Sequence, residues 1–204
     1  MPHKKILIFC LIFICFIGGL ALGHGVMQNS KRLSDYTFVF PTPRNMPEYS
    51  VLNHLDEKTN QTDLLGHWSI MFFGFTHCPD ICPNTLASLV DIQKSFAADK
   101  QPEIILVSVD PMRDTPQLIN QYISSFGGKI SAYTGELHQI QDLTSELGVA
   151  YAYNAMPNND YTVDHSTSIF IINPEGQYVG VFTESLNTTE NIKALRKDIQ
   201  LLIH

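Results

Sequence analysis

Two cysteines four residues apart, Cys78 and Cys82, are the residues in this sequence best suited to chemistry. They directly follow an apolar run, and His165 stands far downstream, just before a second apolar run at residues 169–172. Two thiolates and an imidazole can form a three-ligand site for a soft or borderline metal ion. Cu(I) prefers thiolate sulfur, and imidazole suits both copper oxidation states. The pattern therefore predicts a copper site with Cys78, Cys82 and His165 as ligands.

The spacing of the two cysteines also permits a disulfide. Side chains four residues apart lie about 5–6 Å from each other on a helix, close to the Cα separation of roughly 4.4–6.8 Å that a disulfide tolerates. We expect Cys78 and Cys82 to hold metal when reduced and to form a disulfide when oxidised; a purely structural disulfide is the alternative. Because Cys82 lies at the expected start of a helix, the helix dipole should lower its pKa.

Other polar residues near these motifs have either a supporting role or an ordinary one. Asp110 follows an apolar run and either supports the metal loop or caps a turn. Asp164 either orients a ring nitrogen of His165, as carboxylates behind metal-bound histidines do, or is a solvated turn residue. His77 and Met112 are weaker ligand candidates.

The apolar runs predict the elements that must position these residues. We expect strands at residues 49–53, 68–75, 104–109, 149–153, 166–172 and 177–182, and helices at 83–98, 115–126, 136–147 and from 188 onward. This order predicts an α/β fold of the thioredoxin-like class, with a central mixed sheet flanked by helices. Ligands of open α/β sheets bind at the carboxyl ends of the strands. His165 reaches that edge only if the strand after it runs antiparallel, as the predicted hairpin requires.

The N-terminal part of the sequence predicts a membrane anchor. Residues 6–22 form an uncharged apolar run near the lower length limit for a membrane span. A cleaved signal peptide is the alternative, because Ala21-Leu22-Gly23 fits a small-x-small cleavage site. We expect one transmembrane helix within an anchor at residues 1–23, a polar, proline-containing tether at 24–47 and one globular domain at 48–204.

Charge and flanking residues predict where the domain works. Lys4 and Lys5 precede the apolar run, which places the N-terminus in the cytoplasm and the domain across the membrane. Since no Arg-rich, Ser-rich presequence is present, we expect a bacterial inner-membrane protein facing the periplasm. The net charge of −7 disfavours nucleic acid as a partner.

Three motifs together resemble the SCO/SenC family of membrane-anchored, thioredoxin-like copper chaperones. The motifs are GFTHCPDICP at residues 74–83, VSVDPMRDTP at 107–116 and VDHS at 163–166, and the resemblance covers about residues 48–202. It implies that Cys78, Cys82 and His165 bind copper as Cu(I) or Cu(II). It also implies work on the dinuclear copper centre of cytochrome c oxidase, with the subunit that holds this centre or another copper chaperone as partner. The main departures are the Asn-rich residues 151–161 and the long tether.

The sequence leaves three functions to compare. The favoured one is a metallochaperone, which binds without turnover and is not an enzyme. The second is a thiol-disulfide oxidoreductase that uses Cys78 and Cys82 to keep partner cysteines reduced, and the third is a thiol peroxidase. Three residues separate the cysteines instead of two, and His165 lies where thioredoxin-type catalysts have a cis-proline; both departures favour metal binding. Pro79 and Pro83 remove backbone N–H groups that would bind a peroxide.

Overall fold

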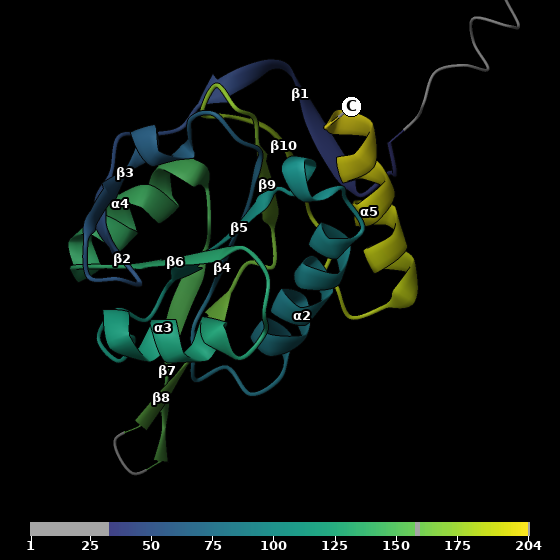
Figure 1. Ribbon diagram of the computed structural model, residues 1–204. Helices are drawn as coiled ribbons and strands as arrows, with labels where there is room; N and C mark the ends of the chain where they lie inside the picture. Colours follow the sequence, from purple (N-terminus) through teal and green to yellow (C-terminus); the bar gives the residue numbers. More distant parts are fainter. Residues whose placement is uncertain (1–32, 158–159, 204) are drawn as a thin grey trace, which may run out of the picture. The chain divides into compact units, whose positions relative to one another are not determined.

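The computed structural model of the protein describes residues 33–157 and 160–203 (Figure 1). A compact unit begins at Ser34 and contains the motifs discussed above. The predicted anchor at residues 1–23 lies outside the described residues. Within the described ranges, no helix has both the length and the apolar character needed to cross a membrane.

The main sheet has eight strands in the order β1-β10-β9-β4-β5-β6-β2-β3. Strand β4 is parallel to β5, and β5 is parallel to β6. Strand β9 runs antiparallel to β4, as the sequence predicts, and β10 runs antiparallel to β9. The strands are β1 (Thr37–Asn45), β2 (Ser50–Asn53), β3 (Lys58–Asn60), β4 (Ser69–Gly74), β5 (Glu103–Ser108), β6 (Ile130–Thr134), β9 (Ile169–Ile172) and β10 (Gln177–Phe182).

Helices cover both faces of this sheet (Figure 1). They are α2 (Ile81–Lys94), α3 (Pro116–Ser124), α4 (Leu137–Leu147) and α5 (Thr189–Leu202), with short 3-10 helices η1 (Gln61–Leu64) and η2 (Ala98–Lys100). Successive residues of β4 point to opposite faces, so Phe72 packs in the cluster formed with α2, α3 and α5, whereas Phe73 packs in the cluster formed with α4. Each such side chain contributes roughly 1.5–3 kcal/mol when fully buried.

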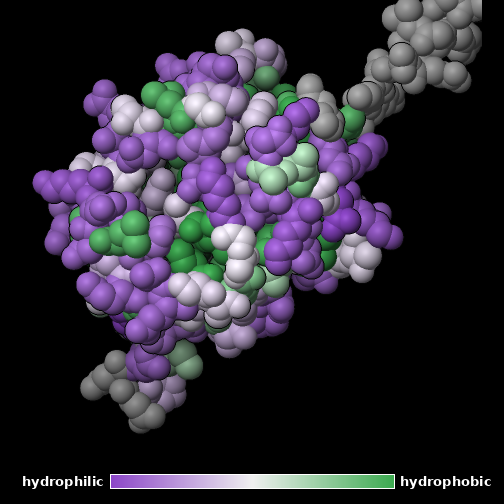
Figure 2. Space-filling model, viewed as in Figure 1, coloured by the Kyte–Doolittle hydropathy of each residue, from purple (hydrophilic) through white to green (hydrophobic). Residues whose placement is uncertain are grey.

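The face of the molecule seen in Figure 2 is mostly polar. Figure 2 shows one face on which hydrophilic residues predominate and apolar residues form small separate patches. Among the described residues, the large apolar side chains that are exposed include Ile81, Met112 and Met156. The mixed α/β sheet with helices on both faces agrees with the predicted fold class.

A separate two-stranded sheet carries the end of the third motif. Strands β7 (Tyr151–Met156) and β8 (Asp160–His165) pair antiparallel, with Tyr151 opposite His165. Figure 1 shows this hairpin extending from one end of the domain. The sequence predicts only a short strand at residues 149–153 and no strand at 160–165, because that segment is too polar to give a strand signal. His165 is therefore the last residue of one strand, not merely the approach to β9.

The structured domain begins earlier than the sequence predicts. Strand β1 lies within the predicted tether at residues 24–47, yet it pairs antiparallel with β10, and Thr37 lies opposite Phe182. The register shifts between Val39 and Arg44, which is where Pro41 and Pro43 fall. Proline is tolerated on an edge strand at such an irregularity because no ladder hydrogen bond is lost there. The prolines therefore do not mark a tether in this stretch.

A buried carboxylate fixes the start of the domain, and its removal should destabilise the fold. Asp198 on α5 has no solvent exposure and accepts hydrogen bonds from the Ser34 amide at 2.9 Å, the Thr37 hydroxyl at 2.6 Å and the Ser34 hydroxyl. We expect Asp198→Ala to lower the free energy of unfolding by about 1–3 kcal/mol, since buried donors lose their acceptor. Urea unfolding measures this, with exposed Asp142→Ala as control; equal stability of the two variants would contradict it.

Candidate metal centre

The two cysteines occupy a tight loop between β4 and α2. The Cys78 amide donates to the Phe75 carbonyl at 3.3 Å, and the Cys82 amide, in the first turn of α2, donates to the Cys78 sulfur at 3.4 Å. Cys82 is 1% exposed, whereas Cys78 is half-buried. Both are free thiols in this structure, so the predicted disulfide between them stays a prediction.

Gly74 makes room for the buried sulfur. A Cβ atom at this position would lie 2.9 Å from the Cys82 sulfur and 3.3 Å from a methyl group of Leu106. The main chain at the end of β4 therefore forms one wall of the site. Any side chain at position 74 would displace the Cys82 sulfur or the strand.

His165 presents one ring nitrogen to the cysteines. Its Nδ1 atom lies 2.9 Å from the Ser166 carbonyl, which can only accept, so Nδ1 carries the proton. The Nε2 atom consequently has a free lone pair and lies 3.4 Å from the Cys82 sulfur. Phe75 packs edge-on against the imidazole at a centroid distance of 5.9 Å, which restricts the orientation of the ring.

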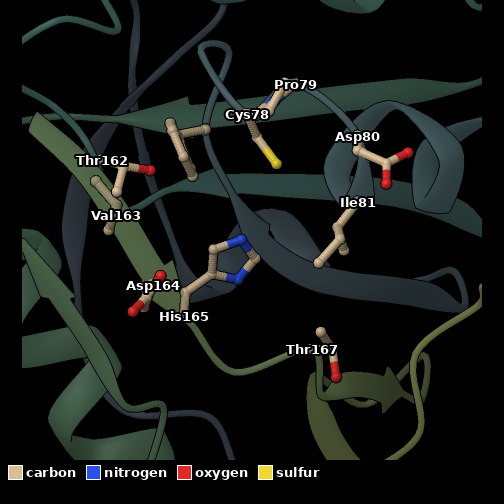
Figure 3. A pocket seen from close by; sticks show the side chains of 10 residues that line it. Cys78, Pro79, Asp80, Ile81, Thr162, Val163, Asp164, His165 and Thr167 are labelled. Carbon is tan, nitrogen blue, oxygen red and sulfur yellow. The ribbon is translucent and has the colours of Figure 1, made fainter. Parts of the chain in front are cut away.

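The structure brings the three predicted ligands together. One donor atom from each of Cys78, Cys82 and His165 lies within 4.8 Å of the other two. Cys78 and His165 line a cavity of about 400 Å³ that is open to solvent, together with Pro79 and Ile81, whereas the Cys82 sulfur is buried. Figure 3 shows the Cys78 sulfur and the His165 ring directed into the space between the cysteine loop and β8. Two sulfurs and a neutral imidazole form a donor set that fits copper.

Asp164 does not orient the histidine through a hydrogen bond. The acceptor for Nδ1 is the Ser166 carbonyl, and the Asp164 carboxylate instead accepts from the Asn154 side-chain amide at 2.7 Å. Asp164 is exposed on the hairpin, so the solvated alternative describes it better. The main-chain carbonyl of Ser166, and not the Asp164 carboxylate, therefore orients the His165 ring.

Asp110 supports the histidine side of the site and not the cysteine loop. It has no solvent exposure and accepts from Arg113 Nε and from the Tyr161 hydroxyl, both at 2.6 Å. Tyr161 belongs to β8, the strand that ends at His165. Asp110 therefore has a supporting role, as predicted, but it supports β8 and not the cysteine loop.

The cysteine loop is supported by Asp114, a residue that sequence reasoning missed. This buried carboxylate accepts from the Thr76 amide at 3.0 Å, the Thr76 hydroxyl at 2.5 Å and the Ser108 hydroxyl at 2.6 Å. The only signal in the sequence is its place in the 107–116 motif. His77 is exposed and lies 3.7 Å from Asp114, so it is not grouped with the three ligands. Met112 is also exposed.

Comparison with known proteins identifies the family. The family model described as SCO1/SenC matches residues 41–200. The chain belongs to the SCO1/SenC family. A SCO2-like protein from Rickettsia typhi is 34% identical over 201 residues, which cover 96% of this chain and 97% of that protein.

Solved structures of SCO1/SenC proteins share the fold. Copper-bound ScoI from Arabidopsis thaliana is 30% identical, with a TM-score of 0.66 over 76% of this chain and 98% of that chain. Copper-bound ScoI from Bradyrhizobium japonicum is 27% identical, with a TM-score of 0.67 over 78% of this chain and 98% of that chain. These similarities confirm the resemblance drawn from the three motifs and the thioredoxin-like architecture.

Burial determines the protonation of two of the three side chains. It raises the pKa of the Cys82 thiol well above its ordinary value, against a backbone hydrogen bond at Phe75 that acts in the opposite direction. The prediction that the helix dipole lowers this pKa is wrong, because desolvation of a 1% exposed sulfur outweighs it. Burial likewise lowers the pKa of His165, so the ring is neutral near pH 7. A metal ion must therefore displace a proton from Cys82 but not from His165 Nε2.

The unequal environments of the cysteines should be visible in alkylation. We expect iodoacetamide to label Cys78 before Cys82 at pH 7, since Cys78 borders the open cavity and Cys82 is buried and protonated. Labelling of Cys82 should accelerate as pH rises toward its raised pKa. Mass spectrometry of the peptides measures both rates, and denatured protein serves as control because the difference should vanish there. Faster labelling of Cys82 in the folded protein would contradict the assignment.

Proposed function

We propose that this SCO1/SenC protein is a copper metallochaperone that helps mature the dinuclear copper centre of cytochrome c oxidase. The observation that carries the proposal is the convergence of two thiols and a neutral imidazole within 4.8 Å, with one of the thiols and the imidazole lining an open cavity. Family membership supports it, because SCO proteins take part in copper binding and cytochrome c oxidase assembly. The partner would be the oxidase subunit that holds the copper centre, or another copper chaperone.

The two sulfurs suit different stages of copper transfer. Cys78 borders the cavity, so an incoming ligand from a partner meets it first. The side chain of Cys82, in the first turn of α2, is buried against the sheet, so Cys82 would release copper last. The sulfur would take back a proton at that step. His165 holds its lone pair toward the sulfurs through the Ser166 contact, which favours Cu(II) as well as Cu(I). Copper would therefore enter and leave through the cavity.

The membrane placement is part of the same proposal. An anchor within residues 1–23 would hold the domain at the outer face of a bacterial inner membrane. The support is the uncharged run at residues 6–22 after two lysines.

A second function, thiol-disulfide exchange, is favoured by one specific contact. The Cys82 amide donates to the Cys78 sulfur at 3.4 Å, which holds this sulfur at the open side of the loop. As a thiolate, Cys78 would attack a partner disulfide and release one partner thiolate. A Cys82 thiolate would then attack the Cys78 sulfur and release the second, leaving a Cys78–Cys82 disulfide and two reduced partner cysteines. The same thiols cannot hold copper during this reaction.

Copper loading tests the main proposal. We expect one copper per chain and, for Cu(II), a sulfur-to-copper charge-transfer band that Cys82→Ala abolishes. His165→Ala should weaken Cu(II) binding at least about tenfold more than Cu(I) binding, because two thiolates alone can hold Cu(I). Competition titrations measure both affinities, with exposed His138→Ala as control. Two tightly bound coppers, or equal losses for the two oxidation states, would overturn this assignment.

A disulfide-reductase assay separates the two functions. We expect the copper-free protein to reduce unrelated disulfides slowly and the copper-bound protein to be inactive, because attack requires a free thiolate. Insulin reduction with Cys78→Ser as the inactive reference measures the rate. Rapid turnover by the copper-free protein, unchanged in His165→Ala, would favour the oxidoreductase.

A further inference from the structure

We propose that residues 110–114, which follow β5, form a bracket that fixes the cysteine side and the histidine side of the metal site through separate contacts. Asp114 holds the cysteine loop, whereas Asp110 and Arg113 hold β8 and thereby position His165. This inference rests on the proposed copper site and deepens it. It assigns Arg113, with Tyr161, as a positioning residue for one ligand.

The hairpin that carries His165 needs such support because it is not part of the main sheet. Within the described residues, β8 pairs only with β7, and β7 pairs only with β8. A two-stranded hairpin by itself is marginally stable in water. The position of His165 therefore depends on what attaches the hairpin to the rest of the domain.

Val163 packs in the core cluster formed with α4, and Arg113 adds a set of polar contacts to this attachment. Its Nε atom donates to Asp110 at 2.6 Å, and one terminal nitrogen donates to the Tyr161 carbonyl at 3.0 Å and to Asp160 at 3.1 Å. The guanidinium also stacks on the Tyr161 ring, 3.8 Å from its centroid. The Tyr161 hydroxyl completes the connection by donating to Asp110. A planar guanidinium can make all these contacts at once, whereas a lysine ammonium cannot.

The hairpin also makes a hydrogen bond to the residue that directly precedes the bracket. The Tyr153 hydroxyl of β7 donates to the Val109 carbonyl at 2.8 Å, directly before Asp110. Tyr153 also packs edge-on against Tyr161 at 5.4 Å. Both strands of the hairpin are thus attached to the same short stretch after β5.

The cysteine side is held by a different set of hydrogen bonds. The Asp114 carboxylate accepts from the amide and the hydroxyl of Thr76, two residues before Cys78, and from Ser108 at the end of β5. Arg113 takes no part in these contacts. The two halves of the bracket can therefore be weakened independently by substitution.

This separation predicts different effects on the two copper oxidation states. A displaced hairpin moves His165 but leaves both thiols in place, so Cu(II) binding should suffer and Cu(I) binding should not. A loosened cysteine loop moves the sulfurs, so both oxidation states should bind more weakly. A purely structural role of Arg113 would not separate Cu(II) from Cu(I).

The test compares Arg113→Lys and Tyr161→Phe with Thr76→Val. Arg44→Lys is the matched control, since Arg44 also stacks on an aromatic ring, 4.3 Å from the centroid of Phe40 on β1. We expect Arg113→Lys to weaken Cu(II) about tenfold, as loss of support behind a ligand does, with Cu(I) affinity unchanged within about twofold. Tyr161→Phe should act in the same direction to a smaller extent. Thr76→Val should weaken both oxidation states, and Arg44→Lys neither.

Hydrogen exchange of the copper-free protein provides a second, independent measurement. Amides of β7 and β8 should exchange faster in Arg113→Lys than in the wild type, while those of β4 and β5 should not change. Equal loss of Cu(I) and Cu(II), or unchanged exchange in the hairpin, would overturn the bracket. If the wild-type protein binds no copper, the proposed function fails, and the exchange experiment still decides whether Arg113 holds the hairpin.

Discussion

Two carboxylates without solvent exposure, Asp110 and Asp114, determine how this end of the molecule is assembled. A buried charge is unfavourable unless it is paired or fully hydrogen-bonded. Asp110 is compensated by a cation and a phenol, and Asp114 by two hydroxyls and an amide. Each carboxylate therefore draws a distant part of the chain to the end of β5. The cysteine loop and the hairpin meet there because these requirements are satisfied together.

The metal ligands are easier to predict from the sequence than the residues that hold them in position. Cys78, Cys82 and His165 were predicted from residue type and from the direction of β9, which the structure confirms as antiparallel to β4. Asp114 was missed because its hydrogen bonds connect elements that are distant in sequence. The lowered pKa predicted for Cys82 was wrong because a helix start is visible in sequence, but the burial of one sulfur is not.

The same distinction explains which elements were predicted. Strands β4 and β5 are continuous apolar runs, and α4 ends where Gly148 adopts φ 70°, so their signals are local. Strand β8 is polar and exists as part of a hairpin fixed by Arg113, so the sequence around it reads as a loop. Strand β1 contains prolines that suggest an extended tether, and only its pairing with β10 reveals a strand.

The close approach of Gly74 to Cys82 has a consequence for how the site opens. The Gly74 carbonyl accepts from the Val109 amide at 2.9 Å. The main chain that forms the wall beside the Cys82 sulfur therefore belongs to the central parallel pair β4 and β5. Moving that wall away from the sulfur requires disruption of the core. Detachment of the hairpin disrupts fewer contacts and should therefore require less free energy. The two cysteines therefore lie beside the central strands, whereas His165 lies on a separate two-stranded hairpin. A brief sub-global opening would leave a two-sulfur site, which suits Cu(I), without unfolding the protein.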